Sequence, residues 1–135
     1  MKQSITPPSF TPAMGAYSHG ISINLTNAKI AFVTGQIAMD ENGNVASDDI
    51  EKQTEFVFEN IKKILAADNM TFMDVVKVQI FVLDMAEFPK ISKIRNKYLG
   101  DSKPASTLVE VSRLVKDGCR VEIEAIAIRE QGQYS

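Results

Sequence analysis

Two short runs rich in apolar and β-branched residues occupy the first part of the chain. GISINLT, from Gly20, and KIAFVTGQI, from Lys29, are separated by the dipeptide Asn27-Ala28. Runs of this composition favour strands, and the short connection predicts a hairpin. The pair Asn42-Gly43 follows in DENGNV and favours a tight turn.

A helical pattern follows over residues 49–67. After Ile50 apolar residues recur with the spacing of one helical stripe, and charged residues occupy the positions between them. Asp48 and Glu51 have the spacing of a capping box, which marks a helix start. The stripe consists of Val57, Phe58, Ile61, Ile64 and Leu65.

The second half of the chain predicts one more helix and three more strands. VVKVQIFVL, residues 75–83, alternates and predicts a strand with Val76, Val78, Ile80 and Val82 on one face. DMAEFPKISKIRNKYL has helical spacing, with Pro89 placed in the first turn because farther inside it would remove a backbone hydrogen bond. The helical stripe consists of Met85, Phe88, Ile91, Ile94 and Tyr98. Residues 105–111 and 120–128 predict the last two strands.

The order β-β-α-β-α-β-β predicts an α/β fold, a single domain over residues 1–135 with one mixed sheet. Both helices are most simply packed on one face of that sheet. The other face would then expose apolar side chains, so we expect it to be covered by another subunit or to form a ligand cleft.

Composition restricts the class of function. Of the 135 residues, 44% are hydrophobic and 24% charged, which fits one globular domain. The net charge of -2 and pI near 5.4 argue against a nucleic-acid partner, because phosphates require clustered cations. No apolar run reaches the ~20 residues of a membrane span, and the N-terminus lacks a signal-peptide core. We expect a cytoplasmic protein without a membrane partner.

Cys119 is the only cysteine and His19 the only histidine. One of each cannot form an intramolecular disulfide or supply a Cys/His zinc set, so we expect no metal and no cofactor. A Cys-His nucleophile pair is formally open, but nothing in the sequence brings the two residues together. We expect Cys119 to be a half-buried packing residue and His19 a strand residue.

Five segments together resemble one protein family. GAYSHGI, VTGQIAMDENGNV, DIEKQTEFVFENIKKIL, DVVKVQIFVLDMAEF and KPASTLVEVSRLVKDGCRVEIEAIAI are similar to successive blocks of the RidA/YjgF family. The resemblance runs from residue 12 to residue 129, in order. It implies a chorismate-mutase-like domain, a homotrimer, a small-molecule cleft at each subunit interface, and deamination of reactive imines and enamines.

The resemblance also implies site residues. The positions that line the family's pocket correspond to Tyr17 and Gly35, with Gln36 beside the latter. The family's glutamate, which positions the water that attacks the imine, corresponds to Glu122. From strand spacing alone, Glu122 could equally be an ordinary solvent-facing residue.

One substrate-binding position departs from the family pattern. The family arginine that binds the substrate carboxylate corresponds to Ser106, followed by Thr107, and Leu108 replaces a cysteine found in many members. A hydroxyl lacks both the charge and the paired donors of a guanidinium. Arg120, two residues before Glu122, could supply a displaced anchor; alternatively it is a strand-end charge paired with Glu122 or with solvent.

Three functions remain open from the sequence. The first is a RidA-like hydrolytic deaminase with altered carboxylate anchoring, favoured by Glu122. The second is a non-catalytic trimeric module that binds a small molecule or has a regulatory role, favoured by Ser106. The third, a ribonuclease or translation inhibitor, is opposed by the acidic charge.

Overall fold

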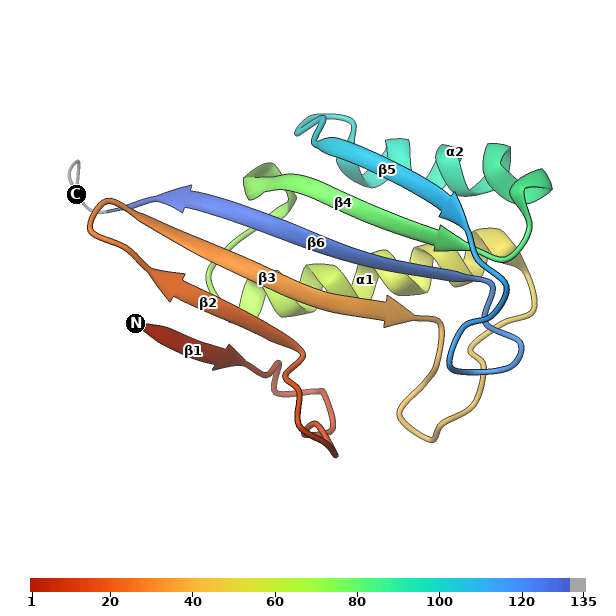
Figure 1. Cartoon of the computed structure of the whole chain (residues 1–135), viewed down its shortest axis with the longest axis horizontal. Coiled ribbons are helices and arrows are strands. Elements are labelled where there is room, and N and C mark those ends of the chain that lie inside the picture. The colour runs from red at the N-terminus through yellow and green to blue at the C-terminus, as the bar shows by residue number, and fades with distance from the viewer. Residues whose placement is uncertain (132–135) are drawn as a thin grey trace.

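Six strands form one mixed sheet in the computed structural model, which describes residues 1–131 (Figure 1). The strand order is β1-β2-β3-β6-β4-β5, and every neighbouring pair is antiparallel except the parallel pair β4 and β5. The strands are β1 (Lys2–Ile5), β2 (Gly20–Asn24), β3 (Ala28–Ile37), β4 (Val75–Val82), β5 (Ala105–Glu110) and β6 (Val121–Glu130). The predicted fold class is confirmed, but β1 was missed because its sequence, KQSI, is too short and polar to stand out.

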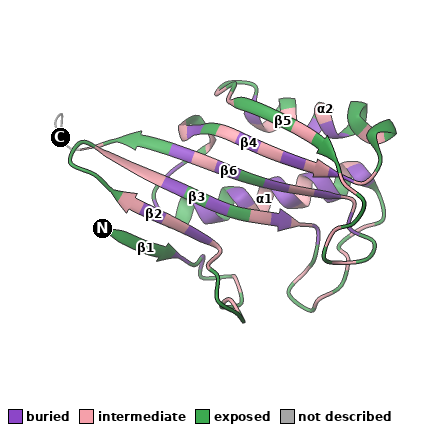
Figure 2. Cartoon of the chain, in the orientation of Figure 1, coloured by how far each residue is buried: buried purple, intermediate pink, exposed green. Residues whose placement is uncertain are grey.

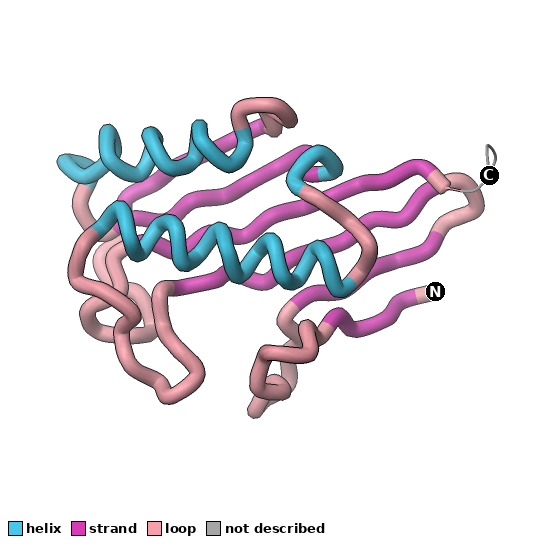
Figure 3. The backbone as a smooth tube through the Cα atoms, turned by 180° about the vertical axis from the view of Figure 1, so that it is seen from behind, coloured by secondary structure: helices cyan, strands magenta, loops and turns pink. Residues whose placement is uncertain are grey.

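Two helices cover one face of the sheet, as predicted (Figures 1 and 3). They are α1 (Ile50–Ala67) and α2 (Phe88–Leu99), and short 3-10 turns precede β4 (η1, Phe72–Asp74) and α2 (η2, Met85–Glu87). The cap of α1 is Asp49 rather than Asp48, because the Asp49 carboxylate accepts a hydrogen bond of 3.0 Å from the Lys52 amide. Pro89 lies in the first turn of α2, where it removes no helical hydrogen bond.

The hydrophobic core lies between the helices and the sheet (Figure 2). α1 packs under β3 and β6 and also contacts α2, which therefore lies toward the β4–β5 side of the sheet. The largest fully buried apolar side chains come from both layers: Phe58, Ile61, Ile64, Leu65, Met70, Ile80, Ile91 and Ile123. The helical stripe predicted for α1 is thus the face that α1 buries.

The side-chain alternation predicted for β4 was wrong at its start. The pairing of β4 with β6 shifts register between Val75 and Lys77, so Val76 is an extra residue in a bulge. Val75 is buried and Val76 is exposed, although the sequence pattern placed Val76 on the core face. Beyond the bulge, Val78, Ile80 and Val82 face the core as predicted.

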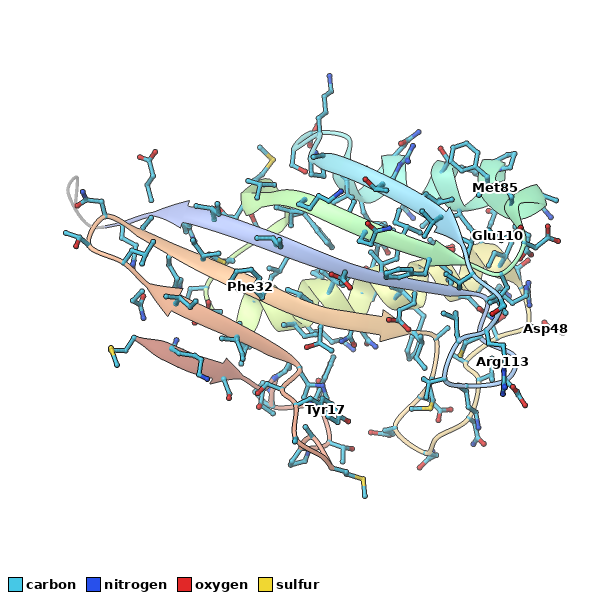
Figure 4. All side chains as sticks on the ribbon, in the orientation of Figure 1. Tyr17, Phe32, Asp48, Met85, Glu110 and Arg113 are labelled. Carbon is cyan, nitrogen blue, oxygen red and sulfur yellow. The ribbon has the colours of Figure 1, made fainter. Side chains whose placement is uncertain are left out.

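The sheet face away from the helices carries exposed apolar side chains from several strands. We call it the open face; Figure 4 shows Phe32 projecting from it. Its exposed large apolar residues include Phe32 of β3, Val109 of β5 and Ile128 of β6. This is the uncovered apolar face that the element order led us to expect.

A buried carboxylate, Asp68, connects the first three strands to the end of α1. Asp68 is 5% exposed, and its Oδ1 lies 3.5 Å from Lys29 Nζ of β3. The same oxygen accepts hydrogen bonds from Gln3 of β1 at 3.2 Å and from Ser22 of β2 at 3.4 Å. One carboxylate therefore links three strands to the helix layer.

We expect Asp68→Ala to lower the free energy of unfolding by about 3 kcal/mol, because it leaves a largely buried ammonium without its carboxylate. Lys29 Nζ still donates a hydrogen bond to the backbone carbonyl of residue 68 at 2.6 Å. The expected loss of unfolding free energy is therefore at the low end of the range for a broken buried ion pair. Urea unfolding measures the change. The control Asp101→Ala removes an exposed carboxylate and should change stability by less than about 0.5 kcal/mol; equal losses for both variants would contradict this role of Asp68.

Neither Cys119 nor His19 has the surroundings of a nucleophile or base. Cys119 is fully buried in the core, beyond the half-burial expected, and burial raises the pKa of its thiol. His19 lies just before β2 rather than within a strand, and its Nε2 lies 2.8 Å from the Thr11 carbonyl oxygen. Within residues 1–131, no group of three His, Cys, Asp or Glu could hold a metal ion, and no helix is long and apolar enough to cross a bilayer.

Candidate functional site

Glu122 projects from β6 onto the open face. Val121 and Ile123 on either side of it are buried in the core, so strand alternation directs Glu122 away from the helices. Its cross-strand neighbours are Ile37 of β3 and Phe81 of β4. Partial burial raises the pKa of the Glu122 carboxyl, and the nearby charge of Glu124 raises it further. This environment makes Glu122 a better proton acceptor than an ordinary surface carboxylate.

A bulge in β3 brings a glycine against that carboxylate. The pairing of β3 with β6 shifts register between Val33 and Gln36, so Thr34 and Gly35 are accommodated without regular partners. A Cβ atom at Gly35 would lie 2.3 Å from Glu122 Oε2 and 3.0 Å from its Cδ. The present position of the Glu122 carboxylate therefore requires that residue 35 have no side chain.

Gln36 supports the bulge from the other side of the sheet. It pairs with Ile123, whose side chain is buried, and Gln36 itself is only 8% exposed. Its Nε2 donates a hydrogen bond of 2.9 Å to the Thr34 carbonyl. Gln36 thus acts on the site through the backbone, and its amide does not reach the open face.

The loop that carries Tyr17 is attached to the same bulge. Thr34 Oγ1 donates to the Ser18 carbonyl at 2.5 Å, and the Thr34 amide donates to the His19 carbonyl at 3.0 Å. Tyr17, labelled in Figure 4, is 57% exposed. It packs edge-to-face with the His19 ring, with 6.4 Å between centroids. We call Gly35 and Glu122 the open-face cluster; Tyr17 is linked to them through the loop backbone that the bulge holds.

Ser106 and Thr107 point to opposite faces of the sheet. Ser106 is in register with Val78, which is buried under the helices, so the Ser106 side chain lies on the helix face near the sheet edge. Thr107 is in register with Gln79 on the open face, and its hydroxyl accepts a hydrogen bond of 2.8 Å from Lys77 Nζ. One ligand cannot contact both side chains from the same face of one chain.

An open pocket lies on the helix face at the β5 edge. It has a volume of about 440 Å³, and the described residues that line it are all apolar: Met85, Ala86, Phe88, Pro89 and Leu108. We call it the edge pocket. Met85 and Phe88 were predicted to belong to the buried stripe of α2, but they are 43% and 38% exposed because they border this pocket. Their exposure could not be inferred from helical spacing.

Arg120 does not face Glu122. Its guanidinium forms a two-pronged contact with Glu87, with Nε–Oε1 at 3.0 Å and Nη2–Oε2 at 3.1 Å. Hydrogen bonding to Glu87 is the main cause that raises the pKa of Arg120. The structure therefore gives Arg120 a partner that the sequence did not indicate, and this carboxylate partner neutralises the charge that a displaced anchor would need.

The expected site residues thus fall into two groups. The open-face cluster lies on one face of the sheet, whereas Ser106 and the edge pocket lie on the other face at the β5 edge. β4 and β5 separate Glu122 from that edge. A site that uses both groups would need two chains.

The sequence matches the family model described as Endoribonuclease L-PSP over residues 9–129. A RutC family protein of Pyrococcus horikoshii is 41% identical over 131 residues, which cover 96% of this chain and 100% of that protein. A Salmonella typhimurium protein named 2-iminobutanoate/2-iminopropanoate deaminase is 30% identical over 132 residues, covering 96% of this chain and 99% of that one.

Solved structures show the same fold. Yeast Mmf1 has a TM-score of 0.85 at 30% identity, covering 95% of this chain and 98% of its own. Escherichia coli TdcF, solved with bound serine, has a TM-score of 0.80 at 28% identity, covering 94% of this chain and 98% of its own. These likenesses extend over nearly the whole chain.

Proposed function

Because this chain belongs to the endoribonuclease L-PSP family, also called the RidA/YjgF family, we propose that it is a hydrolytic deaminase of a small reactive imine or enamine. The observation that carries this proposal is the Glu122 carboxylate, partly desolvated and seated against Gly35 on the open face. A relative 30% identical is named a deaminase of 2-iminobutanoate and 2-iminopropanoate, which supports the substrate class.

The proposed reaction needs one base and one water. Glu122 accepts a proton from the water as its oxygen attacks the imine carbon, and the C=N double bond becomes a single bond. That proton then passes from Glu122 to the nitrogen, which gives a tetrahedral intermediate with one hydroxyl and one amino group. Glu122 next takes the hydroxyl proton and delivers it to the amino nitrogen, the C–N bond breaks, and ammonia leaves while a carbonyl forms. Imine and water are consumed and a 2-oxo acid and ammonia are produced, with no change of oxidation state and no cofactor.

We further propose that the active unit is a homotrimer. The open face exposes apolar side chains from several strands, and the open-face cluster and the edge pocket lie on opposite faces of one chain. Packing the open face of one subunit against the β5 edge of the next would bury apolar surface and bring the two groups together. The small-molecule site would then lie at each subunit interface.

A non-catalytic binding module is the second candidate. Ser106 favours it, since no cation stands at the position where the family places its arginine. This reading keeps the interface site and the small-molecule ligand but assigns no turnover to Glu122. The ribonuclease reading has no such support, because the net charge is -2 and phosphates require cations.

Generating 2-iminobutanoate in situ from L-threonine with a threonine dehydratase tests these alternatives. We expect the purified protein to release ammonia faster than the uncatalysed hydrolysis does. Light scattering should give the mass of a trimer of the 14.9 kDa chain. Binding of the 2-oxo acid product without acceleration would favour the binding module. Degradation of a single-stranded RNA, abolished in an inactive variant, would favour the ribonuclease, and a stable monomer would refute the interface site.

A further inference from the structure

The flank of α2 nearest β5 carries a guanidinium beside the edge pocket. Tyr98 faces α1, since its ring stacks on Phe58 with 5.0 Å between centroids. At 3.6 residues per turn, Phe88, Ser92 and Arg95 lie roughly 60–120° around the helix from Tyr98. Because α1 lies under β3 and β6, this flank of α2 is directed toward the β5 edge.

The Arg95 side chain lies back along that flank toward the start of α2. Its Nη2 donates to Ser92 Oγ at 3.0 Å, and its Nε donates to Asn96 Oδ1 at 3.2 Å. Its Cζ lies 6.0 Å from the centre of the Phe88 ring, and Phe88 lines the edge pocket. Contacts one turn and two turns earlier in the helix therefore hold the guanidinium beside the pocket.

Arg95 retains donors for a ligand. A guanidinium has five N–H donors, and the hydrogen bonds to Ser92 and Asn96 use two of them. Among residues 1–131 no carboxylate lies within salt-bridge distance of Arg95, whereas Arg120 is paired with Glu87. Arg95 is thus a partly buried cation without a counterion, next to an apolar pocket.

Ser106 lies at the matching level on β5. The chain leaves α2 at Leu99 and enters β5 at Ala105, so helix and strand run in opposite directions, and Leu108 meets Phe88 in the edge pocket. Moving from Leu108 to Ser106 covers ~7 Å of strand, and moving from Phe88 to Ser92 covers ~6 Å of helix. Ser106 and Ser92 therefore lie at a similar level along the strand and the helix, and both side chains are small.

We propose that Arg95 is the anion anchor of the edge pocket, and that it binds the carboxylate of a short-chain aliphatic 2-imino acid. This inference rests on the proposed function and specifies how its substrate is held. The carboxylate meets the free N–H groups of Arg95, and the aliphatic chain lies against Phe88 and Leu108. The cation thus comes from the helix rather than from the strand position occupied by Ser106.

Other cations are poorly placed for this role. Lys77 belongs to the open face, where it donates to Thr107. Lys93 lies on another side of α2 and pairs with Glu51 of α1 at 3.2 Å. Arg95, by contrast, lies over the ring of Phe88, which lines the edge pocket.

Calorimetric titration with 2-oxobutanoate, the stable hydrolysis product, tests the proposal without requiring turnover. We expect Arg95→Met to weaken binding by about 10- to 100-fold, since a charge-assisted two-pronged contact is lost. The matched control Lys97→Met removes an exposed charge from another side of the same helix and should bind as wild type. Thermal unfolding checks that both variants remain folded.

A compensating variant makes the test specific. Arg95→Met combined with Ser106→Arg places a guanidinium on β5, two residues before Leu108 of the edge pocket and on the same face of the sheet, so we expect it to recover at least about tenfold of the lost affinity. Wild type that fails to bind 2-oxobutanoate, or Arg95→Met that binds as wild type, would overturn the anchor. If the wild-type protein binds 2-oxobutanoate through Arg95 but does not deaminate 2-iminobutanoate, the proposed role of Arg95 is supported and the proposed deaminase function is refuted.

Discussion

Glu122→Gln is expected to reduce turnover of 2-iminobutanoate by about 10²- to 10⁴-fold, the usual contribution of a general base. Glutamine keeps the size of the side chain and its hydrogen-bonding oxygen but cannot accept the proton of the attacking water. If Glu122 only packs against Gly35, the variant should instead retain turnover within a few-fold of wild type. The measurement is ammonia release at saturating and at low substrate, which separates kcat from KM.

The stability of the same variant separates catalysis from folding. Because folding raises the pKa of Glu122, its ionised form is disfavoured in the native chain, and stability falls as pH rises through that pKa. Removing the charge at neutral pH should therefore leave the melting temperature unchanged or raise it. A large loss of melting temperature would show that the carboxylate is structural.

Glu124→Gln is the matched control, since Glu124 lies two residues along β6 on the same face and is exposed. We expect near-normal turnover at neutral pH. In the wild-type pH profile of kcat/KM, the acid limb should have a midpoint above the ordinary carboxyl pKa of 4.5. In Glu124→Gln this midpoint should move to lower pH, because the negative charge that raises the pKa of Glu122 is gone. An acid limb that does not move would contradict the assignment of that limb to Glu122.

Gly35→Ala is expected to reduce turnover by about 100-fold while leaving the fold intact. The added methyl would lie 2.3 Å from Glu122 Oε2, so the carboxylate must move away from its present position. The atom that moves is the end of a flexible side chain, which makes the cost to stability small. Misplacing a catalytic group by about 1 Å can cost two orders of magnitude in rate.

A double-mutant cycle checks that this effect passes through the carboxylate. In a Glu122→Gln background, Gly35→Ala should reduce the residual rate far less than it does in wild type, because the group it displaces no longer accepts a proton. Equal fold-reductions in both backgrounds would mean that Gly35 lines the substrate cleft independently of Glu122.

Local sequence patterns determined the strongly periodic elements. α1 and the buried positions of β6 were predicted because each buries one face against the core, and such burial imposes a period of 3.6 or 2 on apolar residues. A single mixed sheet with both helices on one face followed from these elements and is confirmed, whereas the order of the strands within the sheet came only from the structure. The polar strand β1 left no such pattern, since it pairs at the sheet edge through its backbone with three of its four residues exposed.

The family resemblance named Glu122 and Gly35 as candidate site residues, but only the tertiary structure showed that they touch. Their contact depends on a bulge that adds one extra residue to β3 opposite β6, and nothing in the sequence signals its register. The same holds for Gln36, which alternation alone cannot assign to a face once a bulge precedes it. The number of residues that separate two side chains in the sequence does not show whether the register of β3 against β6 brings them together.

The partners and positions of the Arg120 and Arg95 side chains could be learned only from the tertiary structure. Arg120 is close to Glu122 in sequence yet pairs with Glu87, thirty-three residues away, because η2 ends beside the start of β6. In the sequence, Arg95 is one of several charged residues on an amphipathic helix. Its position beside the edge pocket depends on how α2 lies against β5. Periodicity specifies the face of an element that is buried, but the partner of a long charged side chain depends on the packing of separate elements, which no local pattern encodes.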